Sequence, residues 1–238
     1  MSPPAAKRLD GRIAVITGAS RGIGAAVARR FAAEGAELYL TARTSGGLEE
    51  TDDAVRAAGG HATLVPFDLT DYAAIDRLGG VIAERHGRLD ILVGNAGTLG
   101  SLRPMGHFPP DEWERVFAVN VTANWRLIRS FDALLRAAPA GRAIFVTSGV
   151  ARGVFPYYGA YAASKAALER MVRTWAGEIT KTRLRANLLD PGVVRTAMRA
   201  LAMPGEDPMT LPHPDQIAPA FVDLALAGDD LNGAVVNA

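Results

Sequence analysis

Short apolar runs alternate with helical patterns along most of the chain. An apolar run without polar alternation is typical of a strand that is buried on both faces of a parallel sheet. A helix instead places its apolar residues three or four positions apart, as Ile23, Val27 and Phe31 are placed. Strands are predicted at residues 12–17, 37–41, 62–67, 89–93, 143–147 and 184–189. Helices are predicted around residues 23–31, at 48–58, 71–86 and 111–138, and around 161.

This alternation predicts one α/β domain, residues 1–238, built on a doubly wound parallel sheet of about seven strands. No linker divides the chain, and the Pro-rich segment 203–214 comes too late to leave a second domain behind it. Residues 1–9 are expected to be flexible, and the tail after residue 189 to be less regular. Ligands of such a sheet bind beyond the carboxyl ends of its strands, so residues 193–213 form either a lid over the site or a plain surface loop.

The first predicted strand runs directly into a glycine-rich turn, Gly18-Ala-Ser-Arg-Gly22-Ile-Gly24, and then into a helix. Glycines let the backbone turn tightly and approach a pyrophosphate, whose charge is met by backbone N–H groups at the helix N-terminus. A strand before the turn and a helix after it are the setting that a nucleotide-binding motif requires. The same glycines without a ligand would simply cap the helix.

Three side chains of complementary chemistry are predicted to meet after the strand at 143–147. Tyr161 and Lys165 stand four apart on one helix face, and Ser148 follows the strand directly. A neighbouring ammonium favours the phenolate, so we expect Lys165 to lower the pKa of Tyr161 from its ordinary value of about 10. Such a phenol exchanges a proton with an alcohol or carbonyl oxygen that the serine hydroxyl holds. Taken alone, this spacing also fits an ordinary helix face with a packed tyrosine and a solvated lysine.

The composition argues against several other classes of function. The chain of 238 residues is 49% hydrophobic and 21% charged, and its formal net charge of +1 favours neither nucleic acid nor an anionic membrane as a partner. It has no cysteine, and its four histidines lack ligand spacing, so no metal site is expected. The N-terminus has no hydrophobic signal segment, and no apolar run approaches the ~20 residues of a spanning helix, which makes the cytoplasm the expected location.

Several short motifs occur in an order and at a spacing that are specific in combination. They are Thr17-Gly-Ala-Ser-Arg-Gly-Ile-Gly24, Asp68-Leu69, Asn95-Ala-Gly97, Asn120, Ser148, Tyr161-Ala-Ala-Ser-Lys165 and Pro191-Gly192 with Thr196. In this combination the chain resembles the short-chain dehydrogenase/reductase (SDR) family over nearly its whole length. The resemblance implies a Rossmann fold and an oxidoreductase that uses a nicotinamide dinucleotide.

The resemblance also implies a role for each matched residue. Tyr161 would be the general acid or base, Ser148 would orient the substrate oxygen, and Lys165 would hold the nicotinamide ribose. Asn120 would hold a water that relays the proton through Lys165; without that role it is a helix-bending or core amide. Besides Tyr161 and Lys165, the cofactor would contact Gly18, Ser20, Arg21, Gly22, Ile23, Gly24, Arg43, Asp68, Leu69, Asn95, Ala96, Gly97, Pro191, Gly192, Val194 and Thr196.

The end of the second predicted strand favours NADP(H) as the cofactor. An NAD enzyme of this fold usually carries a carboxylate there, which binds the ribose hydroxyls and would repel a 2′-phosphate. This chain has Thr41-Ala-Arg43-Thr-Ser45, without an acid, and Arg21 lies in the glycine turn. Two guanidinium groups suit one phosphate. Both arginines would otherwise be ordinary surface charges, and NAD(H) stays an alternative cofactor.

The leading hypothesis is an NADP(H)-dependent carbonyl reductase, or the reverse alcohol dehydrogenase. Candidate pocket residues are largely apolar, which favours a hydrophobic ketone or ketoacyl substrate: Leu99, Val150, Val154, Phe155, Tyr158, Met198 and Met203. One alternative is a non-catalytic redox sensor or scaffold that binds the dinucleotide in the same groove. Another is an epimerase or dehydratase, although the chain leaves little room for the larger substrate domain of such relatives.

The partner expected besides a small-molecule substrate is a copy of the same chain, in a homodimer or homotetramer. The helices at 111–138 and around 161 carry more apolar residues than one face against a sheet needs: Trp113, Phe117, Trp125, Leu127, Ile128, Leu168, Met171, Val172 and Trp175. In the SDR family these two helices pair across a dimer. The chain departs from the family at Gly94, where many relatives have asparagine, and in a C-terminus without the usual glycine-rich finish. The stretch 195–208 resembles a bacterial branch whose substrate is unassigned.

Overall fold

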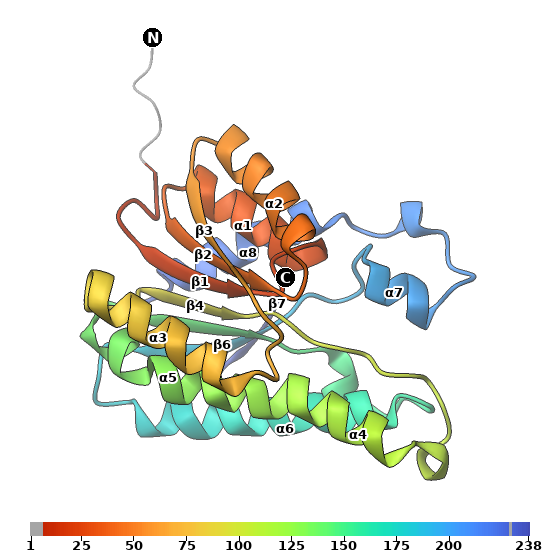
Figure 1. Cartoon of the computed structure of the whole chain (residues 1–238). Helices are drawn as coiled ribbons and strands as arrows, with labels where there is room; N and C mark the ends of the chain where they lie inside the picture. Colours follow the sequence, from red (N-terminus) through yellow and green to blue (C-terminus); the bar gives the residue numbers. More distant parts are fainter. Residues whose placement is uncertain (1–6, 229) are drawn as a thin grey trace.

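A computed structural model of the protein describes residues 7–228 and 230–238, and its centre is one sheet with helices on both faces (Figure 1). The strand order is β3-β2-β1-β4-β5-β6-β7, and all neighbouring strands run parallel. The chain therefore has a Rossmann-like fold, which confirms the predicted fold class. The strands are β1 (Ile13–Thr17), β2 (Glu37–Ala42), β3 (His61–Pro66), β4 (Ile91–Gly94), β5 (Arg142–Val146), β6 (Arg185–Asp190) and β7 (Val235–Asn237).

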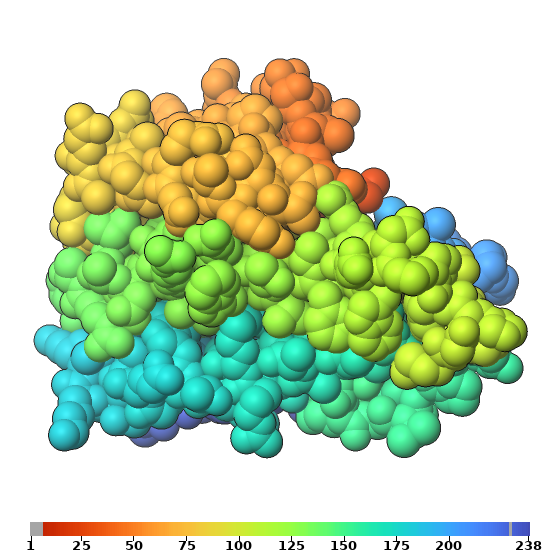
Figure 2. Space-filling view, turned by 60° about the horizontal axis from the view of Figure 1, so that its bottom comes forward, coloured from red at the N-terminus to blue at the C-terminus, as the bar shows by residue number. Residues whose placement is uncertain are grey.

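The helices form two layers, one on each face of the sheet (Figure 1). One layer holds α1 (Gly22–Ala33), α2 (Ser45–Ala57) and α8 (Pro214–Leu226). The other holds α3 (Tyr72–His86), α4 (Pro110–Phe117), α5 (Ala123–Ala137) and α6 (Gly159–Glu178), and Figure 2 shows the outer surface of this layer. The short α7 (Ala197–Ala202) projects from the body of the molecule on the segment that follows β6 (Figure 1).

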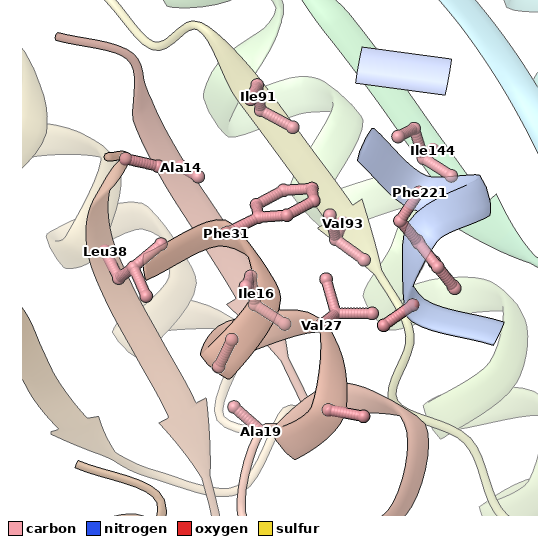
Figure 3. Packing of buried hydrophobic residues seen from close by; sticks show 14 of the residues in the cluster. Ala14, Ile16, Ala19, Val27, Phe31, Leu38, Ile91, Val93, Ile144 and Phe221 are labelled. Carbon is pink, nitrogen blue, oxygen red and sulfur yellow. The ribbon is translucent and has the colours of Figure 1, made fainter. Parts of the chain in front are cut away.

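Alternate residues of the central strands enter two separate cores. Ala14 and Ile16 of β1 belong to the core beneath α1 and α8, where Phe31 and Phe221 fill the space between helices and sheet (Figure 3). Their neighbours on β1 enter the opposite core beneath α3, α5 and α6. Complete burial of each large side chain contributes about 1.5–3 kcal/mol, so the apolar runs that predict strands also hold both helical layers in place.

The helix predicted at 111–138 is interrupted in its middle. Between α4 and α5 the residues Ala118–Thr122 form a single π turn, in which Asn120 is fully buried. The side-chain amide of Asn124 donates to the main-chain oxygen of Asn120 at 2.8 Å. Such wide turns are rare and are frequently found at functional sites.

The tail after β6 is more regular than predicted. It contains α8, a 13-residue helix with Pro219 in its second turn, and β7, which adds to the sheet beside β6. At the start of helix α8 the His213 side chain accepts the backbone N–H of Asp215 at 3.3 Å, and the Gln216 side chain accepts the backbone N–H of His213 at 2.7 Å. Helix α8 was not predicted because its prolines interrupt the helical pattern of the sequence. Burial of residues such as Phe221 stabilises the helix.

The start of the chain also differs from the expectation of flexibility over residues 1–9. Residues 1–6 lie outside the described part. Leu9, by contrast, is fully buried, and its backbone N–H donates to Glu34 at 2.8 Å. Arg8 bonds the carboxylate of Glu34 at 2.7 Å, so the chain is fixed to the end of α1 before β1 begins.

Most of the apolar side chains on the two long helices pack within the chain itself. Leu127, Ile128, Leu168, Val172 and Trp175 all lie in the core beneath the sheet. Trp113 and Phe117 belong to neither core and are half-buried, and Trp125 is 45% exposed, next to the guanidinium groups of Arg126 and Arg129. Among the described helices, none has the length and apolar character needed to cross a membrane.

Candidate active site

The glycine turn packs directly against the segment that follows β4. Gly18 has a φ of +66°, and a Cβ atom on it would lie 2.9 Å from the Cα atom of Ala96. A Cβ atom on Gly24 would collide with the carbonyl oxygen of Gly18 and lie 2.6 Å from the side-chain nitrogen of Asn95. Both positions therefore require glycine for packing, which brings Asn95 and Ala96 next to the turn as the sequence predicts.

Thr17 and Asn95 fasten the carboxyl ends of β1 and β4 together. The Thr17 hydroxyl donates to the carbonyl of Val93 at 3.3 Å and accepts the N–H groups of Asn95 and Ala96, both at 3.0 Å. The Asn95 amide in return donates to the carbonyl of Thr17 at 2.8 Å. A polar network of this kind is stabilising when all its members are bonded, and it fixes the segment after β4 against the end of β1.

Arg21 and Arg43 are both exposed at the edge of the glycine turn. A Cβ atom on Gly47 would lie 2.9 Å from the Cβ atom of Ser20 and 3.3 Å from the hydroxyl of Thr44, so the start of α2 adjoins the turn. Neither arginine forms an ion pair with any carboxylate of the described residues. Two guanidinium groups without acidic partners leave this edge positively charged.

Asp68 and Leu69 follow β3, but Asp68 is engaged by the protein itself. Its carboxylate accepts the Thr70 N–H at 2.9 Å, the Thr70 hydroxyl at 2.8 Å and the Arg115 guanidinium at 2.6 Å. Burial alone would raise the pKa of Asp68, but these hydrogen bonds outweigh it and lower the pKa to about 2. Leu69 is buried in the core beneath α3, α5 and α6. The pair thus ties the loop after β3 to α4 through Arg115, a residue that the sequence analysis did not single out.

Ser148 and Tyr161 meet at the carboxyl end of β5, as predicted. Ser148 is the second residue after the end of β5, and Tyr161 lies in the first turn of α6. Burial raises the pKa of Tyr161 to about 12, although a hydrogen bond with Ser148 acts in the opposite direction, and the nearby Asp190 and Tyr158 raise it further. This direction is the opposite of the one expected from the sequence, because the loss of solvent around the phenol dominates.

Lys165 lies one turn after Tyr161 and is buried to 3% exposure. Its ammonium donates to the carbonyl of Val146 at 2.7 Å and lies 5.8 Å from the centre of the Tyr161 ring. Burial lowers the pKa of Lys165 from 10.5 to about 8. The predicted convergence of the hydroxyl, the phenol and the ammonium is therefore observed, but burial dominates the pKa values of the phenol and the ammonium.

Asn120 reaches this group from the π turn. Its amide donates to the carbonyl of Thr98 and to the hydroxyl of Ser164, both at 2.9 Å, and its oxygen accepts the N–H of Thr98 at 2.8 Å. A Cβ atom on Gly97 would lie 3.3 Å from the Asn120 side-chain oxygen and 3.6 Å from the Lys165 nitrogen. Both polar atoms therefore border the same point beside Gly97.

The segment after β6 approaches the glycine turn from the other side. Gly192 has a φ of +66°, and Val194 is buried. Thr196 caps α7 by accepting the N–H of Arg199, and its methyl carbon would lie 3.5 Å from a Cβ atom on Gly22. Thr196 therefore lies next to Gly22 of the glycine turn.

One group of charged residues near the phenol was missed. Arg152 donates hydrogen bonds to the carboxylates of Glu169 and Asp190, and both acids are 6% exposed. We call these three residues the Arg152 cluster. Two signals were available in the sequence: Glu169 continues the helix face of Tyr161 and Lys165, and Asp190 is an acid at the end of an apolar strand. Their common arginine comes from a loop, so no spacing rule connects it to them.

Within the described residues, no group of three or more histidine or acidic side chains is arranged to hold a metal ion. The site consists instead of a glycine turn, a buried polar network and a serine, tyrosine and lysine, all at the carboxyl edge of one parallel sheet. This combination is typical of α/β proteins that bind dinucleotides.

Comparisons with known proteins agree with that class. The family profile described as short chain dehydrogenase matches residues 12–207. The uncharacterized oxidoreductase YciK of Escherichia coli K12 is 39% identical over 225 residues, which cover 93% of this chain and 88% of YciK. The chain therefore belongs to the short-chain dehydrogenase family, which is a family of oxidoreductases.

Two further relatives differ in the cofactor with which they are described. A solved structure from Escherichia coli CFT073, described as a short chain dehydrogenase complexed with NADPH, is 36% identical, with a TM-score of 0.92 and coverage of 98% of this chain and 99% of that one. An uncharacterized NAD-dependent oxidoreductase of Mycobacterium tuberculosis H37Rv is 37% identical over 204 residues, which cover 80% of this chain and 74% of that protein.

Proposed function

We propose that the protein is an NADP(H)-dependent oxidoreductase that transfers a hydride between the nicotinamide ring and a carbonyl or secondary alcohol. The observation that carries the proposal is the placement of Ser148 just after β5 and of Tyr161 in the first turn of α6, beside the buried Lys165. A dinucleotide-binding sensor would have no use for a phenol and a hydroxyl that meet at one point. Proton transfer to a carbonyl oxygen needs both groups.

The glycine turn fits the pyrophosphate of a dinucleotide. A Cβ atom on Gly22 would meet nothing closer than Thr196, so the backbone there faces an open cradle. No side chain of the described residues caps the N-terminus of α1, which leaves its first N–H groups and the positive end of its dipole for an anion. The nicotinamide of such a dinucleotide, when bound, supplies or accepts the hydride.

Arg21 and Arg43 support NADP(H) over NAD(H). Both are exposed beside the turn, and no acid stands at the end of β2 to bind the ribose hydroxyls or repel a phosphate. Guanidinium groups bind phosphate oxygens in a bidentate manner. The remaining contacts with the cofactor are assigned as expected from the sequence, to Asn95, Ala96 and Gly97 on one side of the groove and to Pro191, Gly192, Val194 and Thr196 on the other. Asp68 and Leu69 are assigned to the adenine end.

Tyr161 is the proton donor in the direction of carbonyl reduction. A phenol with a pKa of about 12 keeps its proton near pH 7, which is the state that a general acid needs. The Ser148 hydroxyl orients the same substrate oxygen and stabilises the negative charge that develops on it. In the direction of alcohol oxidation the phenolate would accept the proton, so positive charge near the phenol would favour that direction.

Lys165 holds the ribose of the cofactor and passes the proton onward. One of its N–H groups is used by Val146, and the other two are available to ribose hydroxyls and to a water. The side-chain oxygen of Asn120 borders the same point beside Gly97 as the Lys165 nitrogen. This arrangement supports the expected role of Asn120 in the proton relay.

The rim of the site favours an apolar substrate. Several large apolar side chains are exposed on the loops around Ser148 and on the segment 193–213: Met105, Val154, Phe155, Tyr157, Leu201, Met203 and Met209. Exposed apolar residues that gather on such loops mark a ligand-binding surface. We infer that residues 1–238 form a single domain in which 193–213 closes over the substrate, because β7 returns the tail to the same sheet.

Association into a homodimer or homotetramer also belongs to the proposal. Its support is Trp125, a large aromatic residue that is 45% exposed on the outer surface of α5. Light scattering of the purified protein measures the assembly directly. A homodimer or homotetramer is expected, and a monomer would contradict this part of the proposal alone.

The proposal is tested by calorimetric titration with NADPH and NADH in parallel, followed by a panel of ketones and aldehydes with NADPH consumption as the readout. We expect tighter binding of NADPH and turnover of at least one apolar carbonyl. Tight binding of NADPH without turnover across the panel would favour the sensor hypothesis. Failure to bind either nucleotide would contradict the assignment of the glycine turn.

A further inference from the structure

The Arg152 cluster joins the three segments that supply the reacting groups. Arg152 ends the short 3₁₀ turn Gly149–Ala151, which follows Ser148. Glu169 lies on α6, two turns after Tyr161, and Asp190 is the last residue of β6, directly before Pro191. One guanidinium therefore crosses from the serine loop to the helix of the phenol and to the strand that leads into the cofactor groove.

Further hydrogen bonds hold both acids in place beneath the loop. Glu169 accepts the hydroxyl of Thr147 at 2.8 Å, and Asp190 accepts the N–H of Gly192 at 3.0 Å. A Cβ atom on Gly149 would lie 3.6 Å from the Asp190 carboxylate, so that carboxylate faces the backbone of the loop. These hydrogen bonds hold both carboxylates in fixed positions, and Arg152 attaches the loop that follows Ser148 to them.

The loop between Arg152 and α6 contains a strained residue. Tyr157 has a φ of +73°, a conformation that costs a non-glycine residue on the order of 1 kcal/mol or more and persists where the surroundings impose it. Its carbonyl accepts the N–H of Arg103 at 3.1 Å at the far end of the loop. Arg152 fixes the near end, next to Ser148.

The cluster also balances buried charge around the phenol. Asp190 of β6 and Tyr158 of the loop raise the pKa of Tyr161, and the Lys165 nitrogen lies 5.8 Å from the centre of its ring. Arg152 of the loop and Glu169 of α6 are joined to this group because Arg152 bonds both Asp190 and Glu169. Lys165 and Arg152 are positive, and Glu169 and Asp190 are negative. Without Arg152, two almost fully buried carboxylates would share this region with a single ammonium, and their charge would oppose the phenolate.

We propose that Arg152 is a positioning residue for the reaction, which fixes the loop of Ser148 onto Glu169 and Asp190 and compensates the carboxylate charge beside Tyr161. This inference rests on the proposed function. Arg152 itself has no contact with the substrate in this role. It acts through the placement of the serine hydroxyl and through the ease with which the phenol ionises.

The test compares Arg152→Gln, Asp190→Asn and the double variant in alcohol oxidation with NADP⁺. The alcohol is the one that corresponds to the best carbonyl of the panel. The rate should rise with pH as Tyr161 becomes a base, and Arg152→Gln should move this rise upward by about one pH unit. Asp190→Asn should move it downward, and the double variant should return toward the parent. We expect kcat to fall in Arg152→Gln while NADP⁺ affinity is retained, and Arg152→Lys to restore part of the lost rate.

Return of the double variant toward the parent is the result that a purely structural role would not produce, since two structural losses would add. An unchanged pH profile in Arg152→Gln, or a double variant worse than both single variants, would overturn the proposal. The matched control is Arg56→Gln on α2, on the opposite face of the sheet (Figure 1), where Arg56 pairs with the buried Asp52 at 2.7 Å. It removes the same charge from the same kind of partner and should leave the pH profile unchanged.

Thermal unfolding provides a readout that needs no substrate. Arg152→Gln should lower the unfolding midpoint, and the added Asp190→Asn change should recover part of the loss because it removes an uncompensated buried charge. If the double variant unfolded at no higher temperature than Arg152→Gln, the proposed charge compensation would be overturned even if turnover were found. A parent protein without turnover would instead remove the proposed function, and with it the positioning role, while the unfolding data would still report on the cluster itself.

Discussion

The carboxyl ends of β1 and β5 carry the two halves of the site, and they differ in how function relates to stability. At the end of β1, Gly18 and Gly24 are required for close packing, in the turn to which we assign the pyrophosphate. At the end of β5, the loss of solvent around Lys165 and Tyr161 disfavours the charged form of each. The comparison shows that the first half is stabilised by the features that would bind a ligand, whereas the second half is destabilised by them.

The largest effect should come from Tyr161→Phe, which removes only the phenolic oxygen. Turnover should fall by about 10²–10⁴-fold, as expected for a lost general acid, while NADPH binding stays nearly intact. Steady-state kinetics and calorimetry check the two parts separately. Tyr72→Phe is the matched control, because Tyr72 lies on α3 and its ring contact with Arg126 does not need the hydroxyl. Unchanged turnover in Tyr161→Phe would remove the proposed mechanism.

Lys165→Met should separate stability from activity. The pKa of Lys165 is lowered from 10.5 to about 8, so between these values the unfolded state binds more protons and stability rises with pH. Below about pH 8 the buried ammonium therefore costs the fold up to ~3 kcal/mol. The substitution should raise the free energy of unfolding at pH 7 by about 1–3 kcal/mol, with a smaller gain at pH 10, and abolish turnover.

Urea unfolding of parent and variant at both pH values measures this difference. A variant less stable than the parent at pH 7 would mean that the hydrogen bond to Val146 outweighs the cost of burial. Both halves of the site would then be stabilised by the residues to which we assign function.

Gly24→Ala should lose stability and binding together. The new methyl group would press on the carbonyl of Gly18 and on Asn95, and such overpacking typically costs about 1–3 kcal/mol. NADPH affinity should fall because the turn must move. Gly80→Ala on α3 is the control: its Cβ atom would meet nothing within 4 Å, so the variant should be as stable as the parent or about 0.5–1 kcal/mol more stable. If the Gly24→Ala protein were less stable but bound NADPH as tightly as the parent, close packing of the turn would not be needed for binding.

The smallest effects concern the choice of cofactor. Arg43→Ala and Arg21→Ala should each weaken NADPH by about 10–100-fold, the loss expected for hydrogen bonds to a charged phosphate, while NADH affinity changes little. Arg85→Ala, an exposed arginine on α3, should affect neither nucleotide. Equal losses for NADPH and NADH would end the argument for a 2′-phosphate site and leave the first half of the site without a preference between them.

The parts of the site that could be predicted from the sequence are those encoded in short contiguous segments. The strands β1 to β6 follow from apolar runs, and the glycine turn follows from its position between a strand and a helix. Tyr161 and Lys165 follow from a spacing of four on one helix, and Ser148 from its place at the end of a strand. These features depend on backbone geometry within a few residues, which the local sequence dictates.

Only the tertiary structure decided the features that depend on partners distant in the chain. The Arg152 cluster needs a loop, a helix and a strand to meet, and Asp68 is engaged by Arg115, which is 47 positions away. Burial raises the pKa of Tyr161 although the spacing to Lys165 predicts the reverse. Solvent exposure and long-range pairing are set by the packing of whole layers, so they arise only when the sheet and both helical layers have come together.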